Sequence, residues 1–280
     1  MKAWKARLVH VRCLWVALAP VVMVAACSVS EEREVAMGKD DATQIESEMP
    51  IVHDSVVDQF ITKLGRSMAS HTNRAALDWH FTVVNSPEVN AFALPGGFVY
   101  VNRGAIEQAD RLDELAGVMG HEIGHVVRRH SVDQMRKAER RGVGLLLLCT
   151  LTRACSTIGG RVAIDVGSHA LSAQYSQRDE AQADSEGVLN TVRAGIDPEG
   201  LPAFFQVLLD KQKEQPDVVE AFFSTHPTDQ SRVSATRRQI AQLNPSPGPG
   251  LVRDTPEFHG IQERVRAFPT PPPKANSGSR

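Results

Sequence analysis

The chain has 280 residues, of which 42% are hydrophobic and 23% are charged, and its formal net charge is −2 with a pI near 6.6. This length and apolar content suffice for one large core or two small ones, so a wholly disordered chain is excluded. The balanced charge excludes a broad basic field of the kind that attracts nucleic acid, and we expect no nucleic-acid partner.

Residues 1–26 are typical of a secretory signal peptide. Four basic residues between positions 2 and 12 precede an uncharged apolar run from Cys13 to Ala26. This run is shorter than the ~20 apolar residues that a membrane span needs. Cleavage of a signal peptide is therefore favoured over a transmembrane anchor.

The apolar run ends in Val24-Ala25-Ala26-Cys27, which resembles the bacterial lipobox, whose cysteine is acylated and becomes the mature N-terminus. Ordinary cleavage also fits, but it leaves Cys27 unexplained. Residues 27–43 are predicted to be a lipidated tether without a fold, attached to the membrane by more than one acyl chain, such as palmitate. By resemblance to other lipoproteins, Ser28 in place of Asp predicts the outer membrane, with the protein facing the periplasm.

Residues 44–243 alternate helical and strand-like patterns and are predicted to form one domain. Apolar residues recur at helical spacing from Pro50 to about Ser70, with the proline in the first turn. Three strand-like runs follow, at residues 80–84, 90–94 and 98–102. Because Pro95-Gly96-Gly97 separates the last two runs, we expect a hairpin there.

A long helix is predicted next, from about Arg111 to Arg141. The apolar run 143–151 is too short to span a membrane, and a buried helix is favoured over a loop that touches the membrane. Helical patterns resume at about residues 178–194, 199–212 and 228–243. Proline-rich stretches mark residues 244–280 as a weakly ordered tail.

Cys149 and Cys155 are the two cysteines that remain after Cys27 in the mature chain. In an exported protein they form either a disulfide or two buried thiols, and both alternatives stay open. A disulfide would require a turn between them, because residues six apart do not share a helix face.

The segment His121-Glu122-Ile123-Gly124-His125 is an H-E-x-x-H motif within the long predicted helix. Residues four apart lie on one side of a helix, so one zinc ion can bind both imidazoles. Glu122 projects beside that position, where it can take a proton from water. A pair of satisfied core histidines would also suit the apolar surroundings, but chance produces this motif only about 0.02 times in a chain of this composition.

A catalytic zinc usually has three protein ligands, so the sequence must supply another. Glu180 and Asp184 lie four residues apart on a second predicted helix. One carboxylate can bind the metal while the other accepts a hydrogen bond from a ligand imidazole. Taken alone, this segment would be interpreted as a solvated acidic face.

With these residues identified, the chain resembles the HtpX- and BepA-type zinc metallopeptidases, relatives of the CaaX prenyl protease and the mitochondrial Oma-type protease. The resemblance is carried by four blocks in the same order, at residues 90–97, 120–125, 180–187 and 224–232. It implies an α+β, mainly helical zincin-like metallopeptidase domain with a small β-sheet. It also implies that the hairpin lies beside the cleft, where an edge strand can bind an extended peptide.

The same resemblance implies roles for individual residues. Glu180 matches the third zinc ligand, and Asp184 matches a carboxylate beside the site that is sometimes described as a proton donor. His226 matches a position near the metal, where it either takes the place of water and keeps the enzyme latent or stabilises the oxyanion. Arg232 matches a residue that can steady the substrate or the oxyanion.

The sequence departs from the family pattern at the start of the second helix. Gln177 occupies a place where the family commonly has arginine, and Arg178 is the next residue. The resemblance therefore assigns no role to Arg178.

The expected function is that of a zinc-dependent endopeptidase of the bacterial cell envelope, with one zinc per chain, that cleaves unfolded or misassembled envelope proteins. One alternative is a non-proteolytic chaperone or assembly factor that uses the zinc domain as a binding scaffold. Another is a lipoprotein stabilised by structural zinc, although structural zinc generally has four protein ligands.

Overall fold

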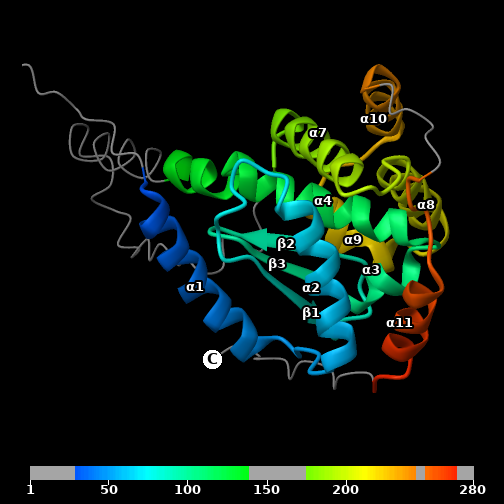
Figure 1. The fold of residues 1–280 in the computed structure, drawn as a ribbon, viewed down its shortest axis with the longest axis horizontal. Helices are drawn as coiled ribbons and strands as arrows, with labels where there is room; N and C mark the ends of the chain where they lie inside the picture. Colours follow the sequence, from blue (N-terminus) through cyan, green and yellow to red (C-terminus); the bar gives the residue numbers. More distant parts are fainter. Residues whose placement is uncertain (1–28, 139–174, 244–249, 270–280) are drawn as a thin grey trace, which may run out of the picture.

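The computed structural model describes residues 29–138, 175–243 and 250–269. The predicted signal peptide, Cys27, the apolar run 143–151 and the pair Cys149 and Cys155 lie outside these ranges. Within them the protein is mainly helical and has one small sheet, which confirms the expected α+β class (Figure 1).

The sheet has three strands in the order β1-β3-β2, and they are β1 (His80–Val84), β2 (Ala91–Leu94) and β3 (Phe98–Asn102). β1 and β3 are parallel, whereas β2 and β3 are antiparallel and pair Ala91 with Val101. The predicted hairpin is therefore confirmed. β2 forms one edge of this sheet.

Successive side chains of each strand point to opposite faces of the sheet, and both faces are buried. On one face, Val83 and Val99 belong to a core that includes residues of α2 (Ser55–Ala69) and α4 (Leu112–Arg128). On the other face, Phe92 and Tyr100 pack against α1 (Glu31–Glu48). Helices therefore cover the sheet from two sides (Figure 1).

The prediction of an unfolded tether over residues 27–43 is wrong for residues 31–43, because these residues belong to α1. The buried side of α1 consists of Glu34, Gly38, Ala42 and Ile45. A Cβ atom at Gly38 would overlap the carbonyl oxygen of Pro95, so glycine allows α1 to approach the β2–β3 turn. Small and charged residues give little apolar periodicity, which explains why the helix was not predicted.

The C-terminal part also differs from the prediction of a weakly ordered tail. α11 (Pro256–Arg266) begins after Thr255, whose hydroxyl oxygen accepts a hydrogen bond from the Phe258 N–H. The Phe258 ring stacks on Phe60 of α2 with centroids 6.3 Å apart. Pro256 lies in the first turn, where proline favours a helix start and does not break order.

Two helix boundaries differ from the sequence prediction. α2 begins at Ser55 because Asp54 caps it by accepting hydrogen bonds from the N–H groups of Val56 and Val57. The long helix predicted to reach residue 141 is interrupted at Arg129, whose φ of 58° is left-handed and ends α4. A separate helical stretch covers residues 130–138.

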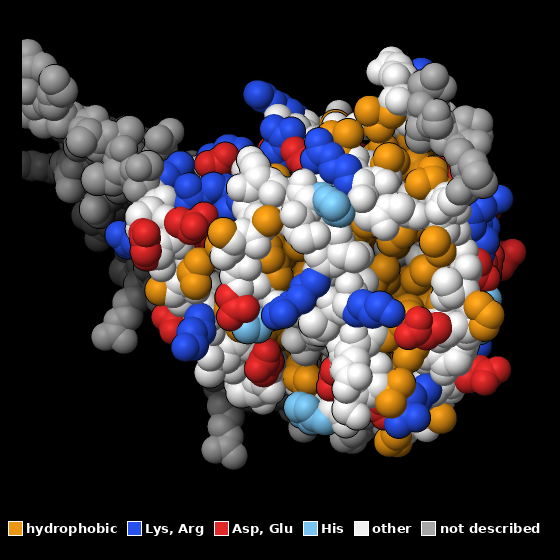
Figure 2. Space-filling model, viewed as in Figure 1, with side chains coloured by type: hydrophobic (Ala, Val, Ile, Leu, Met, Phe, Trp, Pro, Cys, Tyr) orange, Lys and Arg blue, Asp and Glu red, His pale blue; other side chains and the backbone are white. Residues whose placement is uncertain are grey.

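The remaining helices are α3 (Arg103–Gln108), α7 (Gln177–Arg193), α8 (Gly200–Glu214), α9 (Pro216–Thr225) and α10 (Gln230–Leu243). α7, α8 and α10 agree with the predicted helical patterns to within two residues, whereas α9 was not predicted. Among the helices in the described ranges, none combines the length and apolar character that crossing a membrane requires. Basic and acidic side chains are interspersed on the face shown in Figure 2.

Candidate metal centre

The close packing of α7 against α4 creates the site. A Cβ atom at Gly187 would lie 2.9 Å from the backbone nitrogen of His121, so a larger residue there would push the two helices apart. Ser176 starts α7 with a capping box, in which its hydroxyl and the Asp179 carboxylate each bind the other residue's backbone N–H. Glu180, in the first turn of α7, is thereby held beside α4.

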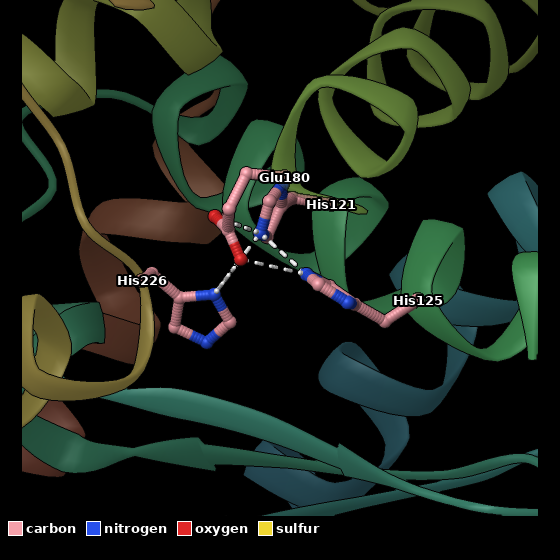
Figure 3. Close-up of side chains that lie close together, drawn as sticks. All are labelled: His121, His125, Glu180 and His226. Atoms are coloured by element: carbon pink, nitrogen blue, oxygen red, sulfur yellow. Dashed lines mark hydrogen bonds and ion pairs between the residues drawn. The ribbon is translucent and has the colours of Figure 1, made fainter. Parts of the chain in front are cut away.

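His121 and His125 of α4, Glu180 of α7 and His226 after α9 converge on one point (Figure 3). The Nε2 atoms of His121 and His125 lie 3.0 Å apart. Glu180 Oε1 lies 3.4 Å from His125 Nε2, and Glu180 Oε2 lies 3.5 Å from His121 Nε2. The candidate ligand atoms of all four residues lie within 4.8 Å of one another, and all four residues are buried.

This donor set fits a zinc ion. Two imidazole nitrogens and one carboxylate are a combination of ligands found in catalytic zinc sites, and here they converge from two packed helices. Burial lowers the pKa of His125 well below its ordinary value, so its ring is neutral, as a metal ligand must be. The predicted ligands His121, His125 and Glu180 are thus brought together by the fold.

Asp184, one turn after Glu180, contacts His121 from the side opposite the cluster. Its Oδ1 lies 2.9 Å from His121 Nδ1, and because a carboxylate can only accept, the imidazole donates this hydrogen bond. The proton then occupies Nδ1 and leaves Nε2 free as a ligand atom. The sequence predicted such a contact for one of the two carboxylates.

Arg232 of α10 neutralises the two carboxylates of α7. Its Nε and Nη2 each donate a 2.7 Å hydrogen bond to Asp184, and its Nη1 pairs with Glu180 Oε2. Burial opposes ionisation of Asp184, but the charge and hydrogen bonds of Arg232 and the contact with His121 together outweigh it and hold the pKa of Asp184 below its ordinary value. The guanidinium also lies over the ring of Phe205, 4.3 Å from its centroid.

Glu122 has the environment expected of a general base. It is 1% exposed, and its Oε1 accepts no hydrogen bond. Burial raises the pKa of Glu122 above its ordinary value, although the nearby charge of His226 opposes this. A buried carboxylate oxygen without a hydrogen bond is poised to accept a proton from a water molecule beside it.

His226 lies inside the donor cluster. Its Nδ1 is 3.1 Å from Glu180 Oε1 and 3.3 Å from His121 Nε2, while its Nε2 is 3.5 Å from Glu122 Oε1. The ring therefore touches both the candidate ligands and the candidate base. By contrast, Arg178 is exposed at the start of α7.

Two residues at the site were not identified from the sequence. His130 Nδ1 lies 3.0 Å from His125 Nδ1, and the ring of Tyr175 lies 3.9 Å from that of His125, centroid to centroid. His130 lies five residues after His125. Residues at this spacing do not lie on the same face of a continuous helix, so they meet only if the helix is interrupted between them. No local pattern points to Tyr175.

A helix with the H-E-x-x-H motif, packed on a small sheet and facing a glutamate from a second helix, defines a zincin-like metallopeptidase domain. Residues 56–240 match the family described as Peptidase family M48, and the chain belongs to this family. These residues include His121, Glu122, His125 and Glu180 as well as His226.

Several curated proteins are similar to the chain. It is 32% identical to the beta-barrel assembly-enhancing protease of Escherichia coli over 248 residues, which cover 86% of the chain and 50% of the relative. It is 31% identical to the Yersinia pestis protein of the same name over 80% of the chain and 47% of the relative. It is 28% identical to the mitochondrial metalloendopeptidase OMA1 of Schizosaccharomyces pombe over 73% of the chain and 60% of the relative. The chain spans about half the length of the bacterial relatives.

Proposed function

We propose that the protein is a zinc-dependent endopeptidase of the bacterial cell envelope that cleaves unfolded or misassembled envelope proteins. The observation that carries this proposal is the buried convergence of His121, His125 and Glu180 beside Glu122, whose Oε1 accepts no hydrogen bond. The names of the bacterial relatives, which describe proteases that enhance β-barrel assembly, support the substrate class.

In this proposal His121, His125 and Glu180 hold one zinc ion per chain. Zinc in such a site acts as a Lewis acid and makes water nucleophilic at neutral pH. Glu122 Oε1 takes the proton of the attacking water and returns it to the leaving amine. Asp184 holds the His121 ring in the ligating tautomer, and Arg232 offsets the negative charge of Asp184 and Glu180.

Strand β2 is the proposed docking edge for substrate. It forms an edge of the sheet and packs against α4, which carries the motif. Main-chain hydrogen bonds to an edge strand bind extended peptides with little dependence on their sequence. Such binding suits unfolded proteins as substrates.

The test of this function is digestion of an unfolded outer-membrane protein by the purified chain, before and after treatment with a zinc chelator. Cleavage should stop on chelation and return with added zinc. The Glu180→Ala variant, which lacks the third ligand, should contain little zinc and behave like the chelated protein. Full zinc occupancy and full cleavage in Glu180→Ala would contradict the ligand assignment.

We further propose that Cys27 is acylated and attaches the protein to the outer membrane, facing the periplasm. The support is the segment Val24-Ala25-Ala26-Cys27 behind a basic and apolar leader. Mass spectrometry of the mature N-terminus should find an acylated cysteine. An unmodified N-terminus on a periplasmic protein released without detergent would contradict the proposal.

His226 is proposed to keep the site closed, because its Nδ1 lies among the donor atoms where a water is needed. His226→Ala should then raise basal cleavage while zinc content stays unchanged. If His226 instead stabilises the oxyanion, the same variant should lose about 100-fold or more in rate, as expected for one lost donor. Rates of peptide cleavage by the two proteins, normalised to bound zinc, distinguish these roles.

A further inference from the structure

We propose that His130 is a positioning residue that holds His125 in its zinc-binding tautomer through a hydrogen-bond chain ending at Gln182. The inference rests on the proposed zinc-dependent function and adds a residue outside the H-E-x-x-H motif. His130 directly follows Arg129, whose left-handed backbone ends α4. Its buried ring lies beside His125, with their Nδ1 atoms 3.0 Å apart.

The proton order along this chain follows from the chemistry of its ends. His130 Nε2 lies 3.1 Å from Gln182 Oε1, and an amide oxygen can only accept, so His130 Nε2 carries a proton. Asp179 Oδ1, 3.9 Å from the same nitrogen, favours this tautomer by its charge. A neutral imidazole has one donor and one acceptor, so His130 Nδ1 accepts the hydrogen bond of His125 Nδ1–H.

The consequence for His125 is that its Nε2 keeps a free lone pair, and this is the atom that faces His121 and Glu180. His121 reaches the same state through Asp184, which accepts from its Nδ1. The two histidines therefore have different partners: a carboxylate fixes His121, and a second imidazole fixes His125. Partners of this kind orient metal-bound histidines and raise their affinity for the metal.

Tyr175 supports the same orientation of His125. Its ring covers the His125 ring at 3.9 Å between centroids, and its hydroxyl lies 3.0 Å from Ser131 Oγ. Of the two residues that follow Arg129, His130 thus contacts His125 directly, and Ser131 contacts it through Tyr175. The break at Arg129 places both of them beside the metal centre.

The test measures zinc affinity of the purified protein by competition with a chromophoric chelator, for His130→Leu and His130→Asn. The two substitutions are similar in size, but only asparagine has an acceptor oxygen where His130 Nδ1 lies. His130→Leu should bind zinc about 10- to 100-fold more weakly than wild type, and His130→Asn should recover most of this loss. The visible spectrum of the cobalt-substituted protein should change in His130→Leu and not in His130→Asn.

Wild-type zinc affinity in folded His130→Leu would overturn the inference. Equal losses of zinc affinity in His130→Leu and His130→Asn would also overturn it, because they would indicate that His130 acts only by packing. If His130→Leu does not fold, Gln182→Met tests the same chain from its other end, at a half-buried position. Gln182→Met should weaken zinc binding, and unchanged affinity would overturn the inference. A wild-type protein that binds no zinc would instead refute the proposed function itself.

Discussion

Replacing Glu122 with glutamine is expected to lower the rate of peptide cleavage by about 10²- to 10⁴-fold, the range that general acid–base catalysis contributes. The amide keeps the shape of the side chain but cannot accept the proton of the attacking water. Glu122 is not one of the three proposed ligands, so zinc content should remain that of the wild type. The measurement is kcat/KM on an unfolded outer-membrane protein, with zinc quantified in the same samples.

Glu186→Gln provides the matched control for this substitution. Glu186 lies on α7 and forms a 2.7 Å ion pair with Arg128, away from the donor cluster. Its replacement should leave cleavage close to the wild-type rate. If Glu122→Gln cleaves as fast as Glu186→Gln, Glu122 is not the base. If the wild type cleaves nothing and both variants still promote envelope assembly, the non-proteolytic alternative is correct.

Glu34→Gln is expected to destabilise the protein by about 3–5 kcal/mol, the cost of removing one partner of a buried ion pair. Glu34 is 1% exposed, and its two carboxylate oxygens accept hydrogen bonds from Arg74 at 2.7 and 3.1 Å. It also pairs with Arg129 and accepts a hydrogen bond from the backbone N–H of Gly96. One carboxylate therefore joins α1 to the β2–β3 turn and to the end of α4.

The loss should appear as a lower midpoint of urea unfolding with an unchanged slope. Glu31→Gln is the matched control, because Glu31 pairs with the same Arg74 at 3.1 Å but its side chain is 57% exposed. Because Glu31 itself stays in contact with water, its replacement should cost only about 0–1 kcal/mol, as for a surface ion pair. Equal midpoints for the two variants would show that the buried contacts of Glu34 do not stabilise the fold.

Features that depend on residues close together in the chain could be predicted from the sequence. Four-residue spacing was enough to place His121 and His125 on one helix face, because helix geometry alone brings them together. The Pro95-Gly96-Gly97 turn likewise identified the β2–β3 hairpin from local backbone preferences. Glu180 was selected with the help of family resemblance, since its own segment reads as an ordinary acidic face.

Contacts between residues far apart in the chain could not be predicted in this way, because they depend on how the helices pack. The contacts of Arg232 with Asp184 and of Glu34 with Arg74 join residues about 40 or more positions apart, and no periodic pattern carries information about such pairs. The buried side of α1 has one large apolar residue, Ile45, beside a glycine, an alanine and a glutamate, so its packing depends mainly on the surfaces opposite it. His130 reaches His125 only because Arg129 adopts a left-handed conformation, which the surrounding contacts stabilise although the residue itself does not favour it.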